Sequence, residues 1–93
     1  MNIKNKTIVI TGAGNGIGRA WALKFHQEQA HVVAADIDIK SLASLSDIGI
    51  STKNVDVRDS TQVTELITGT QSKTGRVDVL FNNAGIAFGA RVE

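Results

Sequence analysis

Four glycines fall within seven residues near the start of the chain, in the stretch VITGAGNGIG from Val9 to Gly18. The stretch follows a run of β-branched residues and leads into a segment with helical apolar spacing. A glycine-rich turn in this position brings main-chain N–H groups and the positive end of a helix to one point. The chemistry predicted for this turn is therefore the binding of an anion such as a phosphate group.

Two common phosphate-binding motifs do not fit the spacing. A P-loop ends in Gly-Lys-Ser/Thr, whereas GIGRAW supplies neither the lysine nor the hydroxyl. A G-x-G-x-x-G motif beginning at Gly12 would need glycine or alanine at the position of Ile17. The chain instead carries Thr11-Gly12-x-x-x-Gly16-x-Gly18.

This pattern resembles the TGxxxGxG branch of the short-chain dehydrogenase/reductase family. In that fold Gly12 would permit a tight exit from the strand, Gly16 would let a pyrophosphate approach the backbone, and Gly18 would let the helix pack closely on the sheet. A second match is NNAG, from Asn82 to Gly85, directly after VDVLF. The resemblance extends from Lys6 to about Glu93, so it covers nearly the whole chain.

The resemblance also implies roles for two acids that follow later strands. Asp36 stands 18 residues after Gly18, where an acid in this fold accepts hydrogen bonds from the adenosine ribose. Asp56-Val57 resembles the family pair that holds the adenine amine and covers the ring, although a surface acid before a helix cap explains Asp56 equally well when it is taken alone. The expected cofactor-binding residues are Gly12, Asn15, Gly16, Ile17, Gly18, Asp36, Ile37, Asp56, Val57, Asn83, Ala84 and Gly85.

Charge around Asp36 favours NAD over NADP as the cofactor. Asp36 and Asp38 place two negative charges where the 2′-phosphate of NADP would sit. Neither Asn15 nor Ile37 supplies a basic side chain to offset them. We therefore expect repulsion of NADP.

The elements that must position these residues alternate between strands and helices. Strands are predicted at 6–11, 31–36, 51–57 and 76–83. Between them we expect a helix from Gly16 to about Gln29, a short helix capped by Asp38, and a helix that begins at Asp59 and Gln62 and stops at Gly75. This alternation predicts an α/β fold with a Rossmann-type doubly wound parallel sheet of four strands in the order 3-2-1-4.

Apolar residues on the first predicted helix recur every fourth position. Ile17, Trp21 and Phe25 follow this spacing, with Ala20 beside them. They predict one apolar stripe along the helix, and packing is the expected role of Trp21.

Composition describes an ordinary soluble globular protein of one domain at most. The chain has 93 residues, with 10 basic and 9 acidic side chains and 42% hydrophobic residues. This balance gives no argument for nucleic acid or a membrane as a partner. The absence of cysteine excludes a disulfide framework, no metal-ligand spacing is present, and we expect a cytoplasmic protein.

The chain contains no tyrosine, although the chemistry of the family needs one as general acid/base, followed four residues later by lysine and preceded by a serine. No catalytic residue is therefore assigned. We expect residues 1–93 to form a single partial dinucleotide-binding domain from which the catalytic half is absent, consistent also with the absence of proline, because the family has a Pro-Gly turn near the nicotinamide.

The leading hypothesis is the N-terminal part of an NAD-dependent oxidoreductase that interconverts an alcohol and a carbonyl, with a small-molecule substrate only in a full-length form. The alternatives are a non-catalytic module that binds NAD or adenosine, and an inactive fragment. The apolar fourth strand would lie at a sheet edge and could promote self-association. Substrate and oligomeric state stay open.

Overall fold

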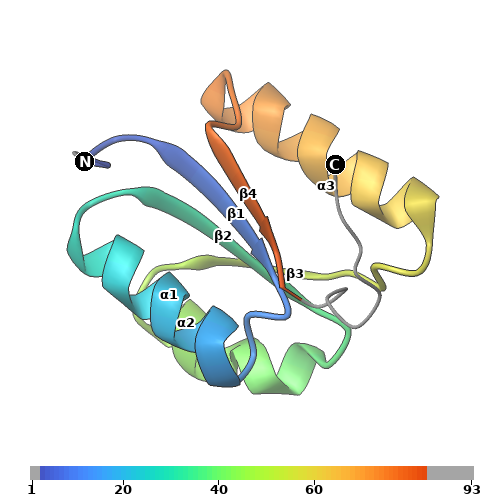
Figure 1. Cartoon of the computed structure of the whole chain (residues 1–93), viewed down its shortest axis with the longest axis horizontal. Helices are drawn as coiled ribbons and strands as arrows, with labels where there is room; N and C mark the ends of the chain where they lie inside the picture. The colour runs from blue at the N-terminus through green and yellow to red at the C-terminus, as the bar shows by residue number, and fades with distance from the viewer. Residues whose placement is uncertain (1–2, 84–93) are drawn as a thin grey trace.

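The computed structural model of the protein describes residues 3–83. Strands and helices alternate along this part of the chain (Figure 1). In order, the elements are β1 (Thr7–Thr11), α1 (Gly16–Gln27), β2 (His31–Asp36), the 3₁₀ turn η1 (Ile39–Leu42), α2 (Ala43–Asp47), β3 (Ser51–Asn54), α3 (Ser60–Thr74) and β4 (Val79–Asn82).

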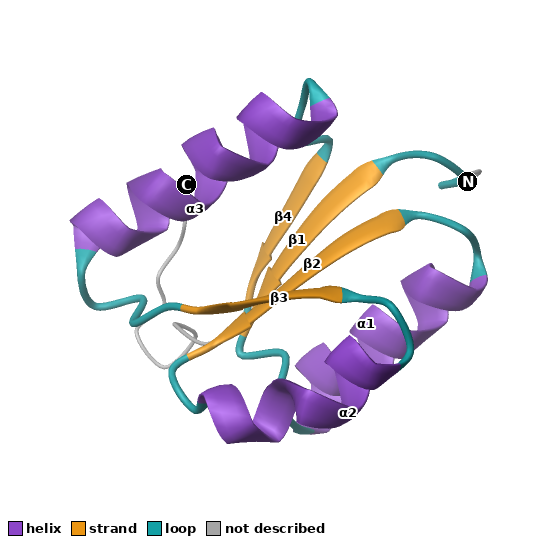
Figure 2. Cartoon of the chain, turned by 180° about the vertical axis from the view of Figure 1, so that it is seen from behind, coloured by secondary structure: helices purple, strands orange, loops and turns teal. Residues whose placement is uncertain are grey.

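The strands of the described residues form one parallel sheet in the order β3-β2-β1-β4, which confirms the predicted order. In the register of the sheet, Val9 of β1 is paired with Val33 of β2 on one side and with Leu80 of β4 on the other. Figures 1 and 2 show α1 and α2 on one face of the sheet and α3 on the opposite face. The carboxyl ends of all four strands consequently meet at one edge of the sheet.

The two central strands are buried because apolar residues face both layers. Alternate residues such as Ile8 and Ile10 pack toward α1 and α2, while Val9 and Val33 pack toward α3. Every residue of β1 is buried. The continuous β-branched run therefore forms the strand between two helical layers that its pattern predicted.

The face of α1 that packs on the sheet is not the predicted stripe. Ile17 and Trp21 are 65% and 40% exposed, whereas Gly18 and Ala22 are buried. Because α1 approaches the sheet through these two small residues, its bulky residues are displaced toward the β4 edge. There the Trp21 ring contacts Phe81, with 4.2 Å between ring centroids. Trp21 therefore packs as predicted, but at the edge of the sheet and not in its centre.

The helix α1 ends two residues earlier than predicted. Gln29 adopts a left-handed conformation with φ of 70°, and its N–H donates to the His26 carbonyl over 3.0 Å. The Ala30 N–H donates to the Phe25 carbonyl at the same distance. These two bonds form a Schellman ending, in which glycine would adopt the left-handed conformation without strain.

The two edge strands are shorter than the sequence predicted. β3 ends at Asn54 rather than at residue 57, because the chain turns there toward α3 and the Val55 N–H makes the last main-chain bond to Asp36. β4 begins at Val79, because the carboxylate of the preceding Asp78 bonds to the Thr7 N–H over 2.7 Å. Edge strands have a ladder on one side only, so their ends depend on such local contacts.

The predicted helix boundaries around α3 are confirmed. The Asp59 carboxylate accepts hydrogen bonds from the N–H groups of Thr61 and Gln62, as an N-cap should. The Gln62 side chain then departs from the usual capping box, since its oxygen accepts from the Asp56 N–H over 2.9 Å. Gly75 ends the helix with φ of 91°.

Candidate functional site

The turn between β1 and α1 exposes main-chain groups at the start of the helix. Gly12 and Gly16 have φ of 66° and 61°, a region that favours glycine. The Asn15 side chain makes no capping hydrogen bond, and α1 has no acidic residue in its first turn. An ideal Cβ built on Gly16 would meet no described atom within 4 Å. The turn is therefore open to an incoming group at Gly16 and leaves helix N–H groups without a side-chain cap.

Two other glycines are required by close contacts inside the protein. A Cβ on Gly18 would collide with the Gly12 carbonyl and would lie 2.8 Å from Nδ2 of Asn83. A Cβ on Gly14 would collide with the Ser41 side chain. Gly18 thus lets α1 approach the turn, as expected, and Gly14 lets the turn approach η1.

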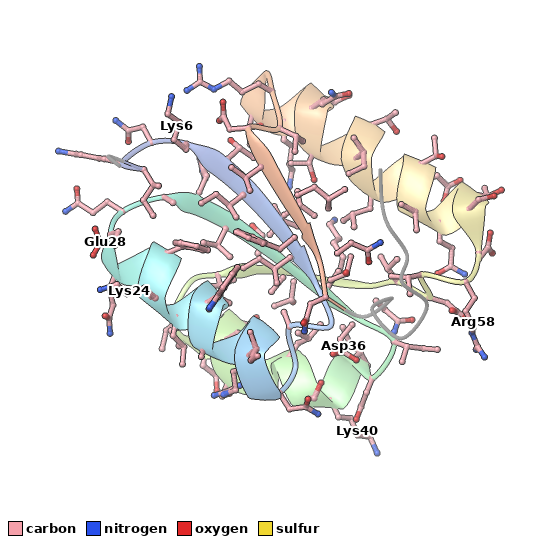
Figure 3. All side chains as sticks on the ribbon, in the orientation of Figure 1. Lys6, Lys24, Glu28, Asp36, Lys40 and Arg58 are labelled. Atoms are coloured by element: carbon pink, nitrogen blue, oxygen red, sulfur yellow. The ribbon has the colours of Figure 1, made fainter. Side chains whose placement is uncertain are left out.

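Asp36 ends β2 beside this turn, and both of its carboxylate oxygens accept main-chain hydrogen bonds. Oδ2 accepts from the Gly14 N–H over 2.9 Å, and Oδ1 accepts from the Asp38 N–H over 2.9 Å. The structure therefore brings Asp36 and the glycine turn together, and Figure 3 shows Asp36 at the end of β2. A carboxylate has about four acceptor positions, so capacity for ligand hydroxyl groups remains.

Exposed apolar side chains flank the glycine turn and Asp36. Ile17 is 65% exposed at the start of α1, and Ile37 is 57% exposed directly after Asp36. Val57 is half-buried after β3, and Asn15 is exposed on the turn. Large exposed apolar residues beside polar main-chain groups suit a ligand that has both a flat ring and an anionic part.

Asp56 is held differently from Asp36. Its Oδ1 and Oδ2 accept hydrogen bonds from Nε and Nη2 of Arg58 over 3.0 and 2.9 Å. These side-chain bonds are the main reason why the pKa of Asp56 lies below its usual value, and the same contact raises the pKa of Arg58. Arg58 projects from the turn before α3, away from Asp36 (Figure 3). The carboxylate expected to receive an adenine amine is therefore already paired.

Polar side chains at the end of β4 connect it to β1 and the glycine turn. The Thr11 hydroxyl donates to Oδ1 of Asn82 over 2.9 Å, and Nδ2 of Asn83 donates to the Gly12 carbonyl over 3.3 Å. The two asparagines thus fix the ends of β1 and β4 relative to each other. The remaining predicted residues, Ala84 and Gly85, lie outside the described residues.

Three residues near the site were not singled out from the sequence. Gly14 could have been found, because it is one of the four glycines of the turn and the only one outside the Thr11-Gly12-x-x-x-Gly16-x-Gly18 pattern. Ser41 and Asn54 gave no signal, since their relation to Asp36 depends on the placement of η1 and on the pairing of β3 with β2.

Other features of the described residues involve none of the predicted site residues. A cavity of about 630 Å³ lies between β3 and α3, bordered by Val55, Leu66 and Thr70, and none of the predicted site residues lines it. In the same part of the chain, no helix has both the length and the apolar character that a membrane span requires. Residues 3–83 also contain no group of three or more metal-ligating side chains.

Comparisons with known proteins all find dehydrogenases and reductases. The sequence model of the short chain dehydrogenase family matches residues 6–93. The chain is 44% identical over 91 residues to meso-2,3-butanediol dehydrogenase of Serratia marcescens, an alignment that covers 92% of this chain and 36% of that protein. It is 42% identical over 92 residues to the 3-oxoacyl-[acyl-carrier-protein] reductase of Thermotoga maritima, covering 92% of this chain and 37% of that protein.

A solved structure is similar in both fold and sequence. The 3-ketoacyl-(acyl-carrier-protein) reductase from Brucella melitensis, complexed with NADH, superposes with a TM-score of 0.77 at 31% identity. The match covers 84% of this chain and 34% of that one. The chain thus spans about a third of the length of the proteins that it matches.

Proposed function

The chain belongs to the short chain dehydrogenase family of oxidoreductases, and from that premise we propose that it binds NAD(H) as the N-terminal, cofactor-binding part of an enzyme that interconverts an alcohol and a carbonyl. Residues 1–93 form one partial dinucleotide-binding domain in this proposal. The substrate and the walls of its pocket belong to the rest of the enzyme.

The observation that carries the proposal is the contact between Asp36 and the glycine turn. The 2.9 Å bond from the Gly14 N–H to Oδ2 of Asp36 joins the ends of β1 and β2 next to the point where the sheet order reverses. Ligands of open α/β sheets bind at such switch points, outside the carboxyl ends of the strands. A carboxylate and an uncapped helix start in this place fit the ribose and the pyrophosphate of one dinucleotide.

The residues present fit the cofactor by their chemistry. The open backbone at Gly16 and the first N–H groups of α1 would hold the pyrophosphate, because no described atom would meet a Cβ there and no acid stands in the first helical turn. Asp36 would accept the ribose hydroxyls, and Ile37 with Val57 would cover the adenine ring. Gly12, Asn15, Ile17, Gly18, Asp56 and Asn83 to Gly85 complete the proposed site.

The preference for NAD over NADP rests on charge near the ribose. Asp36 and Asp38 both lie at the end of β2, and a 2′-phosphate would approach the two carboxylates. The guanidinium of Arg19, on the first turn of α1, donates to the Ser44 hydroxyl over 2.6 Å and is therefore already engaged by the protein. The relative solved with NADH is consistent with this choice.

The chain's own residues bind and orient; they do not carry the proton chemistry. When bound, the nicotinamide would supply or accept a hydride. A neighbouring general acid must exchange a proton with the substrate oxygen, and the sequence has no tyrosine for the role that the family gives to that residue. The same absence favours a second candidate function, a non-catalytic module that binds NAD or its adenosine part, with an inactive fragment as the remaining alternative.

A calorimetric titration of the 93-residue chain with NADH and NADPH tests the proposal. We expect saturable NADH binding, at least tenfold weaker NADPH binding, and weaker NADH binding by Asp36→Ala. Asp47→Ala removes the same charge from the exposed end of α2 and should leave the affinity unchanged. No NADH binding by the folded wild-type chain would overturn the proposal, and equal loss in both variants would show a nonspecific charge effect.

An assay with alcohols and NAD tests the expectation, common to both candidate functions, that this chain carries no catalytic residue. NADH binding without turnover by the 93-residue chain supports a chain whose catalysis requires further protein or which only binds. Turnover by the chain itself would contradict our assignment of no catalytic residue.

Self-association through β4 is a further part of this proposal. β4 pairs only with β1 among the described strands, and its Leu80 is 41% exposed. The other edge strand carries the exposed Lys53, a side chain that discourages edge pairing. Light scattering should show a concentration-dependent increase in mass that Leu80→Lys suppresses, and a monomer at all concentrations would refute it.

A cytoplasmic location also belongs to the proposal. Without cysteine the chain has no disulfide to maintain, so its fold is compatible with a reducing compartment. Fractionation of the source cells would test it, and recovery with the membrane fraction would contradict it.

A further inference from the structure

We propose that Asn54 is a positioning residue for the dinucleotide site, which sets the orientation of the Asp36 carboxylate and of the Ile37 side chain. The inference rests on the proposed binding of NAD(H). Asn54 lies on β3 and was not among the predicted site residues. It contacts the site only at the main chain of Asp36 and Ile37, where β2 ends.

The contact is made by the amide nitrogen of one side chain. Nδ2 of Asn54 donates to the Ile37 carbonyl over 2.7 Å and to the Asp36 carbonyl over 3.2 Å. Both partners are acceptors, which requires that the nitrogen and not the oxygen of the side chain faces them. The bond to Ile37 is the shorter of the two and is therefore the main contact.

Asn54 occupies the last paired position of its strand. It is in register with Asp36, and the Val55 N–H makes a further bond to the Asp36 carbonyl over 3.1 Å. Beyond this point β2 and β3 diverge, so the ladder offers no main-chain donor to Ile37. The Asn54 side chain thus extends the pairing by one residue past the end of the ladder.

This extension fixes the segment that orients the carboxylate. The peptide whose carbonyl accepts the bond from Asn54 is the one that joins Ile37 to Asp38, and its N–H donates to Oδ1 of Asp36 over 2.9 Å. One peptide unit is therefore held on its carbonyl side by Asn54 and holds the acid on its N–H side. Because this peptide unit is planar, a rotation of the unit would displace its carbonyl from Asn54 and its N–H from Asp36 together.

A purely structural role for Asn54 would give a different result. Asn54 is exposed and lies at the end of an edge strand, while the main-chain pairs from Val33 with Ser51 onward do not need its side chain. Its removal should therefore change unfolding little and ligand binding more.

The experiment compares Asn54→Ala and the isosteric Asn54→Asp with Ser51→Ala, a control at the other end of β3. NADH affinity of the 93-residue chain is measured by calorimetry, with and without Asp36→Ala, and the amide signals of Gly14 and Asp38 are followed by NMR without ligand. We expect NADH affinity to fall about fivefold in Asn54→Ala and more in Asn54→Asp, which cannot donate. Ser51→Ala should bind as the wild type does.

Most of the effect should disappear in the background of Asp36→Ala, because Asn54 acts mainly through that carboxylate and only in part through Ile37. An equal loss in both backgrounds, or wild-type affinity in Asn54→Ala, would overturn the inference while leaving the proposed function intact. Failure of the wild-type chain to bind NADH would instead overturn the proposed function. In that case the NMR arm decides: unchanged signals of Gly14 and Asp38 in Asn54→Ala refute the positioning role, and shifted signals support it.

Discussion

The carboxylates of Asp36 and Asp56 follow neighbouring strands of one sheet, and both were predicted to bind parts of the same nucleotide. Main-chain N–H groups of Gly14 and Asp38 hold Asp36, while the guanidinium of Arg58 holds both oxygens of Asp56. Peptide groups are part of the fold and remain in place. An exposed arginine side chain can move, and pairs of this kind contribute little stability.

An acid of the right type in the right sequence position is therefore not enough to define a binding site. The Asp36 carboxylate is held at the glycine turn by main-chain N–H groups and not by a basic side chain. A ligand amine at Asp56, by contrast, must share the carboxylate with Arg58 or displace the arginine side chain. We therefore expect Asp36 to dominate nucleotide affinity, with a small contribution from Asp56.

The largest expected effect comes from removing each charge in turn. In Asp36→Asn the new NH2 group would face one of the two N–H groups, that of Gly14 or that of Asp38, and the charge would be lost. We therefore expect NADH affinity to fall about 30-fold, as for hydrogen bonds to charged groups. Asp56→Asn should change it less than threefold. Calorimetry on both variants measures the contrast, and equal losses would show that the manner of support does not matter.

The next effect tests the main-chain support of Asp36 directly. A Cβ in Gly14→Ala would collide with the Ser41 side chain and lie 2.9 Å from Oδ2 of Asp36. We expect the turn to move, with a loss of about 2 kcal/mol of stability and about tenfold weaker NADH binding.

Chemical denaturation and calorimetry provide these two measurements. Gly69→Ala is the matched control, because a Cβ there would meet no described atom within 4 Å, and it should stabilise α3. The contact between position 14 and the Ser41 side chain is tested further by adding Ser41→Gly to Gly14→Ala. The double variant should recover part of the lost stability and part of the lost NADH affinity. Wild-type behaviour of Gly14→Ala would show that the turn is not held against Asp36.

A third acid combines both kinds of support. The Thr7 N–H is the main reason why the pKa of Asp78 lies below its usual value, and Arg76 adds to the effect. An aspartate whose pKa is lowered by folding stabilises the fold at pH values above the ordinary aspartate pKa. This stabilisation is lost as the pH falls through the lowered pKa. Asp78→Asn should therefore lower the Tm by a few degrees at pH 7 and by less at pH 3.

Thermal unfolding at the two pH values measures this effect. Asp47→Asn, at the exposed end of α2, should leave the Tm nearly unchanged at both. A Tm difference for Asp78→Asn that stays constant or grows toward acid would contradict the assigned sign.

The smallest expected effect comes from removing Arg58, the arginine that forms an ion pair with Asp56. In Arg58→Ala the pKa of Asp56 should rise toward its usual value, because the side-chain bonds from Arg58 are the main cause of its depression. The freed carboxylate should tighten NADH binding no more than about threefold. Carboxylate NMR and calorimetry measure these changes. Arg76→Ala, which breaks an ion pair at the start of β4, is the control, and weaker binding by Arg58→Ala would indicate that the arginine itself contacts the nucleotide.

Prediction from the sequence succeeded where one local pattern was sufficient. The run from Thr7 to Thr11 is buried as its composition indicates, and Asp59 and Gly75 bound α3 as their cap chemistry requires. Prediction was weaker at the edges. The exposure of Trp21 could not be read from helical spacing, because it depends on how Gly18 and Ala22 seat α1 against the sheet.

The order of the elements, the glycine turn and the acids at the ends of the second and third strands could be predicted from the sequence alone, since these follow from local spacing and residue type. The tertiary structure was needed to see that Asp36 is the acid that meets the turn and that Asn54 reaches the peptide after Ile37. The pair of Asp56 with Arg58 is a local contact between residues two positions apart, and the sequence analysis did not consider it. Hydrogen bonds join groups within about 3 Å, and the pairing of parallel strands brings residues that are 17 to 22 positions apart in the sequence to that distance.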